Sequence, residues 1–204
     1  MVIGNGMIAK EFESYFNNEG IIIFSFVVSD STNTNKAAFE REKKLVTDII
    51  KTSMGKLLVY FSTCSIYDPS MQDSAYVQHK IKMENFIRDN HAPYIIFRLT
   101  NPIGKTNNTH TVVNYFINNI IENNKFTVWK NASRNIIDID DMYLLCNEIL
   151  QQKLFTNSIV NIANPANYPV SFIVETLETH FNMKGNYDVI DKGGAPIIDT
   201  NALD

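Results

Sequence analysis

Cysteine is scarce in this sequence. Cys64 and Cys146 are its two cysteines in 204 residues, and two thiols are too few for a disulfide framework. Neither cysteine lies in a paired metal-ligand spacing, and the four histidines show no HxxxH or HExxH arrangement. We therefore expect neither a disulfide-stabilised fold nor a metal site.

The sequence also lacks a stretch dense in lysine and arginine. Its 18 basic and 22 acidic residues give a net charge of −4, and phosphate neutralisation needs concentrated positive charge, so we expect no nucleic-acid partner. Long apolar runs are missing too, because residues 21–28 fall far below the ~20 residues that cross a bilayer. The first four residues show no signal-peptide features, so we expect no membrane contact and a cytoplasmic location.

What is present is an ordinary globular composition, with 45% hydrophobic and 20% charged residues. Apolar runs alternate with segments of helical periodicity along the chain, which predicts a parallel sheet with helices on both faces. We expect strands at residues 2–3, 21–28, 57–61, 94–99, 126–129 and 160–163. We expect helices at 7–17, 36–52 (capped by Asn33 or Asn35), 74–90, 111–123, 140–153 and 170–183, then an irregular tail over 185–204.

The first turn carries a glycine motif. Gly4-Asn5-Gly6-Met7-Ile8-Ala9 is GxGxxA between the first strand and the first helix. In a dinucleotide site the first glycine permits a tight turn, the second lets a pyrophosphate approach the backbone, and the small third residue allows close packing. The alternative is a plain strand-turn-helix corner, but the position of the motif favours dinucleotide binding.

A second pattern is Tyr76 followed by Lys80, which share one face of the helix predicted at 74–90. A phenol of ordinary pKa about 10 needs a cation and a hydrogen-bond partner to exchange protons near neutrality. The spacing is common by chance, so a solvated helix face is the alternative reading. The flanking strand ends favour proton exchange by Tyr76 over a solvated helix face. One strand is followed by Ser62-Thr63-Cys64-Ser65, and another ends in Arg98-Leu99-Thr100-Asn101-Pro102-Ile103-Gly104.

This order of motifs resembles the extended branch of the short-chain dehydrogenase/reductase superfamily, the NAD-dependent epimerase/dehydratase family that acts on nucleotide sugars. Residues 134–142 and 159–163 are similar to later segments of that family, and so is Asp199-Thr200. The resemblance implies one α/β domain over residues 1–204, with a shortened, Rossmann-like, doubly wound parallel sheet. It also implies a small C-terminal substrate lobe, from about residues 126–138 and 164–204, bound NAD or NADP, and a homodimer formed through helices 36–52 and 74–90.

The resemblance also implies roles for individual residues. Tyr76 is the catalytic acid/base, Lys80 binds the nicotinamide ribose and lowers the pKa of Tyr76, and Thr63 bonds the reacting sugar oxygen. The implied cofactor-binding residues are Gly4, Asn5, Gly6, Met7, Ile8, Ser25, Phe26, Ser62, Tyr76, Lys80 and Leu99. The implied substrate-binding residues are Thr63, Cys64, Ser65, Asn101 and Arg134.

The departures from the family narrow the function. The family's 4,6-dehydratases carry Asp-Glu after the threonine, where this chain has Cys64 and Ser65, so dehydration is disfavoured. About one strand-helix-strand unit of the family's fold is missing from this chain. The acidic residue that binds the adenosine ribose in the family is missing with it. We expect an NAD(P)-dependent reductase of a 4-keto nucleotide sugar, with a 4-epimerase or a non-catalytic relic as alternatives.

Several side chains have alternative structural roles. We expect Asp138, Asp140 and Asp141 to supply a helix N-cap and first-turn acids. Arg134 pairs either with a pyrophosphate or with Asp138 or Asp141. Cys64 either touches substrate or fills the turn as a buried thiol.

Overall fold

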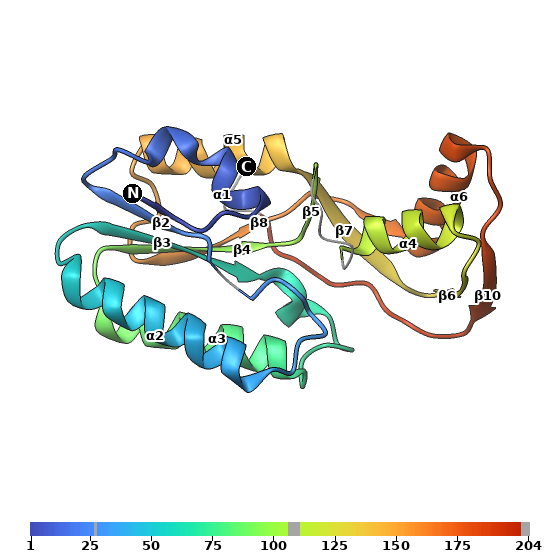
Figure 1. The fold of residues 1–204 in the computed structure, drawn as a ribbon, viewed down its shortest axis with the longest axis horizontal. Coiled ribbons are helices and arrows are strands. Elements are labelled where there is room, and N and C mark those ends of the chain that lie inside the picture. The colour runs from blue at the N-terminus through green and yellow to red at the C-terminus, as the bar shows by residue number, and fades with distance from the viewer. Residues whose placement is uncertain (27, 106–110, 201–204) are drawn as a thin grey trace.

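A computed structural model describes residues 1–26, 28–105 and 111–200. Val27, which belongs to a predicted strand, His110 and the last four residues of the predicted tail lie outside the described residues. Figure 1 shows a central sheet covered by helices at one end of the molecule and a smaller group of elements at the other. None of the described helices is long and apolar enough to cross a membrane.

The central sheet is parallel throughout. Its strands lie in the order β1 (Val2–Ile3), β2 (Ile21–Phe24), β3 (Leu57–Thr63), β4 (Tyr94–Leu99) and β8 (Ser158–Ile162). The middle strands are buried almost end to end, as expected when helices cover both faces. The predicted Rossmann-like parallel sheet is therefore confirmed.

Helices cover the two faces of this sheet in pairs. On one face lie α1 (Met7–Glu11), the short 3₁₀ turn η1 (Glu13–Tyr15) and α5 (Ile139–Gln151), packed in one core cluster that includes Phe12 and Met142. On the other lie α2 (Lys36–Thr52) and α3 (Ala75–Asn90), which pack on Tyr60 and its neighbours. Figure 1 shows these pairs above and below the sheet.

The crossover through α1 has the opposite hand to those through α2 and α3. The steps from β1 to β2, β2 to β3 and β3 to β4 all run in the same direction across the sheet. The helix of the first step nevertheless lies on the opposite face from α2 and α3, so its crossover has the opposite hand. The step from β4 to β8 runs in the same direction, and its helix α5 shares the face of α1. Two of these parallel crossovers therefore have one hand and two have the other.

The second group of elements builds its own small core. It contains α4 (Val112–Ile121), α6 (Val170–Phe181), β6 (Lys125–Trp129) and β10 (Asn186–Ile190), packed around Phe116 and Phe126. The prediction of an irregular tail is wrong here, because β10 pairs in parallel with β6 over its whole length. A three-stranded sheet of β5 (Asn101–Ile103), β7 (Ser133–Asp138) and β9 (Asn167–Pro169) lies between this group and the central sheet.

Side-chain caps fix several of the predicted helix starts. Asn35 accepts from the amides of residues 37 and 38 and begins α2, so the choice between Asn33 and Asn35 is settled. Ser74 caps α3, Thr111 caps α4 and Asp138 caps α5, which confirms the structural reading of Asp138. Asp140 and Asp141 lie in the first turn of α5.

Two predicted boundaries are wrong. The strand predicted at 21–28 ends at Phe24, where Ser25 donates both its amide and its hydroxyl to the carbonyl of Ile3. The helix predicted at 7–17 ends at Glu11 and gives way to η1. Both segments remain apolar beyond these points, so hydrophobic pattern alone does not reveal where the regular hydrogen bonding stops.

Candidate functional site

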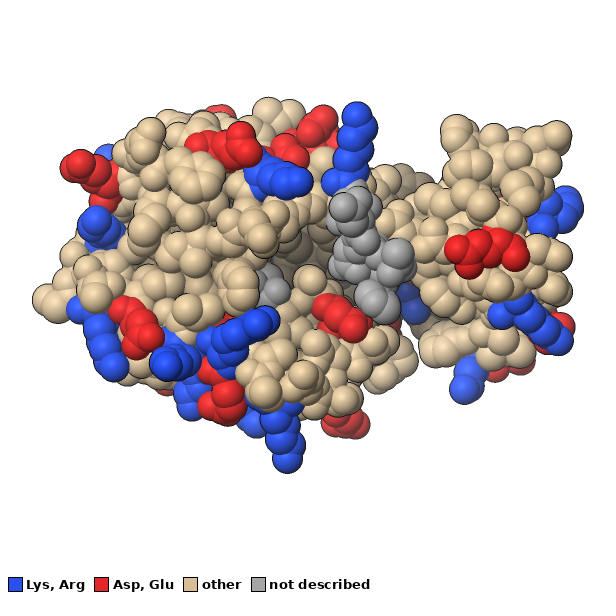
Figure 2. All heavy atoms as spheres, viewed as in Figure 1, with Lys and Arg blue, Asp and Glu red and all other residues tan. Residues whose placement is uncertain are grey.

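A cavity of about 880 Å³ opens at the carboxyl ends of β1 to β4, where open parallel sheets bind ligands. Most of the residues predicted for the site line it: Asn5, Gly6, Met7, Ile8, Ser25, Phe26, Ser62, Thr63, Cys64, Ser65, Tyr76, Lys80, Leu99, Asn101 and Arg134. Gly4 is the one predicted cofactor-binding residue that does not line it. Figure 2 shows acidic and basic side chains interspersed over the visible face.

The two glycines of the first turn have different surroundings. Gly4 has a φ of +134°, and a Cβ on it would lie 2.7 Å from Ser25 Oγ and 3.0 Å from the backbone carbon of that residue. A Cβ on Gly6 would meet nothing within 4 Å. Gly4 is therefore required by the fold itself, whereas Gly6 keeps the cavity side of the turn open.

This contrast predicts different effects of the same substitution. We expect Gly4→Ala to lower the free energy of unfolding by about 2 kcal/mol or more, because it adds a strained φ and a clash with backbone. We expect Gly6→Ala, at the N-cap of α1, to cost less, about 1 kcal/mol. Urea unfolding of both variants checks the pair, and equal losses of stability would contradict this account of the turn.

Thr63 and Tyr76 meet at the cavity wall. Thr63 ends β3 and caps the short 3₁₀ helix η2 (Cys64–Tyr67), accepting from the amide of Ser65 at 3.0 Å and donating to its hydroxyl at 2.9 Å. Tyr76, in the first turn of α3, lines the same cavity. Burial raises the pKa of Tyr76 to about 12, and the nearby Thr63 hydroxyl only partly opposes this. Near neutral pH Tyr76 is therefore a proton-bearing phenol.

Lys80 lies one helical turn beyond Tyr76 and is 1% exposed. Its Nζ lies 3.1 Å from Glu42 Oε1, 3.2 Å from the Tyr60 hydroxyl and 3.5 Å from the Phe61 carbonyl oxygen. The distance from Nζ to the Tyr76 ring centre is 5.9 Å. In this arrangement Lys80 is paired with a carboxylate, and the pKa of Tyr76 is raised rather than lowered.

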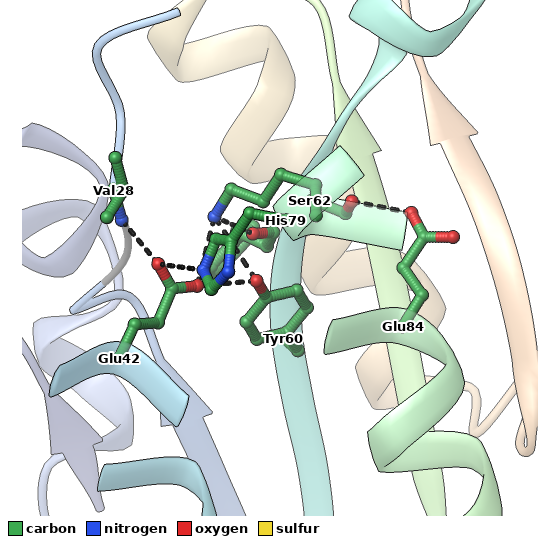
Figure 3. Close-up of polar contacts among 8 residues, drawn as sticks. Val28, Glu42, Tyr60, Ser62, His79 and Glu84 are labelled. Atoms are coloured by element: carbon green, nitrogen blue, oxygen red, sulfur yellow. Dashed lines mark hydrogen bonds and ion pairs between the residues drawn. The ribbon is translucent and has the colours of Figure 1, made fainter. Parts of the chain in front are cut away.

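Glu42, on α2, is the functional candidate that sequence reasoning missed. It is 1% exposed and accepts from the Tyr60 hydroxyl at 2.5 Å and the Val28 amide at 2.8 Å, and His79 Nε2 lies 3.2 Å from its Oε2 (Figure 3). Burial alone would raise the pKa of Glu42, but Lys80 and these hydrogen bonds lower it to about 2. A signal existed in the sequence, because Glu42 stands in the apolar stripe that continues through Val46 and Ile49.

A second buried carboxylate, Glu84 on α3, ties the strand ends together. It accepts from the Ser62 hydroxyl at 2.5 Å (Figure 3) and from Arg98 Nε at 2.9 Å and Nη2 at 2.6 Å. Arg98 Nη1 in turn donates to the Tyr67 hydroxyl at 3.0 Å. The Ser62 hydroxyl therefore points to Glu84, and its hydrogen is used within the fold.

The predicted substrate residues Asn101 and Arg134 come from the three-stranded sheet. Asn101 Nδ2 donates to the carbonyl of Asn135 at 2.7 Å. Arg134 Nη1 donates to the Ser133 carbonyl and lies 3.6 Å from Asp68 Oδ2. The ion pair of Arg134 is therefore with Asp68, and the predicted pairing with Asp138 or Asp141 is wrong, because those residues belong to the start of α5.

Cys64 borders the cavity as a buried thiol whose Sγ donates to the Arg98 carbonyl at 3.2 Å. Burial raises its pKa to about 12, although nearby Arg98 opposes the shift. Because the thiolate is the reactive form, we expect iodoacetamide at pH about 8 to label Cys64 far more slowly than a free cysteine peptide. Mass spectrometry checks this, with the urea-unfolded chain as the control. Labelling at the free-peptide rate would contradict it.

These features define a class. A parallel sheet with a glycine turn after its first strand and a cavity over its carboxyl edge is the arrangement of Rossmann-like dinucleotide-binding proteins. The model of the family described as "NAD dependent epimerase/dehydratase family" matches residues 19–163. The chain belongs to this family, which confirms the family resemblance.

Solved structures support the fold at low sequence identity. The chain is similar to UDP-glucose 4-epimerase from Thermus thermophilus in complex with NAD, with 12% identity, a TM-score of 0.73, and coverage of 96% of this chain and 74% of that one. It is also similar to RMD from Pseudomonas aeruginosa complexed with NADPH, with 12% identity and a TM-score of 0.73. The match covers 99% of this chain and 90% of that one.

A third structure, dTDP-glucose 4,6-dehydratase from Bacillus anthracis str. Ames in complex with NAD, shares 13% identity with a TM-score of 0.71, covering 98% of this chain and 71% of that one. The comparison with curated proteins gives no match. At these identities the structural likeness establishes the fold.

Proposed function

We propose that this protein is an NAD(P)-dependent oxidoreductase that reduces a 4-keto group on a nucleotide-linked sugar. The observation that carries the proposal is the Thr63–Tyr76 pair, a protonated phenol and a nearby hydroxyl on the wall of the cavity. Cys64 and Ser65 follow Thr63, so the chain has no carboxylate pair there to remove water. Proton donation to a carbonyl oxygen needs only the phenol and its partner.

The residues present fit a dinucleotide. Gly6 leaves the cavity side of the first turn open, and a volume of about 880 Å³ lies within the range of cofactor sites. Asn5 to Ile8, with Ser25 and Phe26, would hold the phosphate and ribose part, while Leu99 and Lys80 would flank the nicotinamide. When bound in its reduced form, the cofactor supplies a hydride.

The chain's own contribution is the proton. Tyr76 would donate its phenolic proton to the sugar oxygen as the keto carbon becomes an alcohol, and Thr63 would hold that oxygen in line. The phenolate left on Tyr76 needs a nearby cation, which is the role proposed for Lys80. Asn101 and Arg134, which also line the cavity, would hold the phosphate region of the substrate.

Two alternatives use the same fold. A 4-epimerase would use the same residues, retain its NAD and rotate the sugar. The short sheet favours the second alternative, a non-catalytic relic of the family. Within the described residues β1 is an edge strand, so no further strand encloses the adenosine end of the cavity.

The test is to mix purified protein with NADH or NADPH and a set of 4-keto nucleotide sugars, and to follow nicotinamide absorbance together with the sugar product. Oxidation of the cofactor with formation of the 4-hydroxy sugar is the expected result. NAD retained from expression, with interconversion of 4-hydroxy sugars, would favour the epimerase. Absence of both reactions across the set would overturn the enzymatic proposal.

Gly6 gives a binding test that is separate from stability. A methyl group at this position would occupy the space left for the pyrophosphate, so we expect Gly6→Ala to weaken dinucleotide binding by roughly tenfold or more, about 1.4 kcal/mol. Calorimetric titration of wild type and variant measures the ratio. Unchanged affinity in a variant that folds normally would place the phosphates elsewhere.

A homodimer and a cytoplasmic location remain part of this proposal. The apolar residues of α2 and α3 that were expected to permit a dimer pack on the sheet instead. A dimer through these helices would therefore use their polar outer faces. Analytical ultracentrifugation decides between monomer and dimer.

A further inference from the structure

We propose that Glu42 is a positioning residue of this site: its carboxylate holds the Lys80 ammonium at the cavity wall and ties the loop after β2 to the same group. This inference rests on the proposed function, in which Lys80 supports Tyr76. Neither the glycine motif nor the tyrosine-lysine spacing points to Glu42, which comes from a different helix.

The donors of Lys80 are fully used. An ammonium group has three N–H bonds, and here they face Glu42 Oε1 at 3.1 Å, the Tyr60 hydroxyl at 3.2 Å and the Phe61 carbonyl at 3.5 Å. The contact with Phe61 is the longest. A ribose hydroxyl can therefore replace it without breaking the ion pair with Glu42.

The charge of Lys80 depends on Glu42. The groups around Lys80 are Glu42 from α2, Tyr60 from β3, and Tyr76 and Glu84 from its own helix, with His79 reaching it through Glu42. Of the two carboxylates, Glu42 is the one in contact, while Glu84 binds Ser62 and Arg98. A fully buried ammonium that loses its counter-ion releases its proton more easily.

The second oxygen of Glu42 reaches the cavity wall. Oε2 accepts from the Val28 amide at 2.8 Å, and Val28 lines the cavity with Ser25, Phe26 and residues 29–33. His79 stacks on Phe39 with ring centres 4.4 Å apart and places Nε2 3.2 Å from the same oxygen. One carboxylate therefore fixes both Lys80 and the loop that borders the proposed cofactor site; Figure 3 shows its contact with Val28.

Glu42→Gln keeps the shape of the side chain and removes its charge. We expect kcat to fall roughly tenfold to a hundredfold, and the alkaline limb of the kcat profile to move to lower pH by about one unit or more, because Lys80 loses its proton earlier. The control is Glu178→Gln, which removes a buried carboxylate paired with Lys184 at 2.8 Å in the C-terminal group of elements. It should leave the pH profile unchanged.

A purely structural Glu42 would lower stability without moving the pH profile, so a Glu42→Gln profile that coincides with wild type overturns the proposal. The double variant Glu42→Gln/Lys80→Met covers the case of poor folding. We expect it to regain stability relative to Glu42→Gln, because no unpaired buried charge remains, while its kcat stays at or below that of Glu42→Gln. Equal stability of the two would contradict the pairing. Failure of wild type to bind NADH or NADPH would instead overturn the proposed function, and the stability comparison would still test the pair.

Discussion

Tyr76→Phe should lower the kcat of ketone reduction by roughly a hundredfold to ten-thousandfold, the range expected for loss of a positioned proton donor. The variant keeps the ring that fills the space beside Thr63 and loses only the hydroxyl. We expect dinucleotide affinity to stay near the wild-type value and the free energy of unfolding to change by about 1 kcal/mol, that of one hydrogen bond. Steady-state kinetics and calorimetric titration measure the two effects.

The matched control is Tyr94→Phe. Tyr94 is also buried, at 7% exposure, but it begins β4 at the end of the sheet opposite the cavity. Its substitution should leave kcat unchanged. A Tyr76→Phe enzyme that retains most of its activity would show that another group donates the proton.

Arg98→Met should lower the free energy of unfolding by about 3 to 5 kcal/mol, because it leaves the buried carboxylate of Glu84 without its cation. Glu84 is 2% exposed and takes two hydrogen bonds from the Arg98 guanidinium. Urea unfolding of wild type and variant measures the loss.

Arg88→Met is the control for this prediction. Arg88 also pairs with an acid, Asp89, at 3.2 Å, but both side chains are more than half exposed. Such surface pairs contribute about 0 to 1 kcal/mol, so the control should be nearly neutral. Similar losses for the two arginines would show that burial of the Glu84 pair does not determine its contribution.

Local signals in the sequence predicted the helices well. Asn35, Ser74 and Asp138 cap three helices because each side chain bonds the amides next to it, and such bonds depend on neighbouring residues alone. The β10 strand was missed for the opposite reason. Its pairing with β6 joins residues about sixty positions apart, and short polar strands acquire regular structure only from such tertiary contacts.

In the candidate site too, some residues could be predicted from the sequence and others depend on tertiary contacts. The family resemblance implied the roles of Thr63 and Tyr76, and both residues line the cavity. Glu42 was not found, because a glutamate in a charged helix is usually solvated. Its position in line with Val46 and Ile49 was the available signal, and its partner Lys80 lies on a separate helix that only the folded chain brings near.

The central claim is that this shortened sheet still binds a dinucleotide at the glycine turn, and calorimetric titration of the purified protein with NADH and NADPH tests it most directly. The account predicts saturable binding of one of the two at micromolar concentration, weakened by Gly6→Ala. No heat of binding from either cofactor up to the low-millimolar range would contradict it and leave a family member that has lost its cofactor.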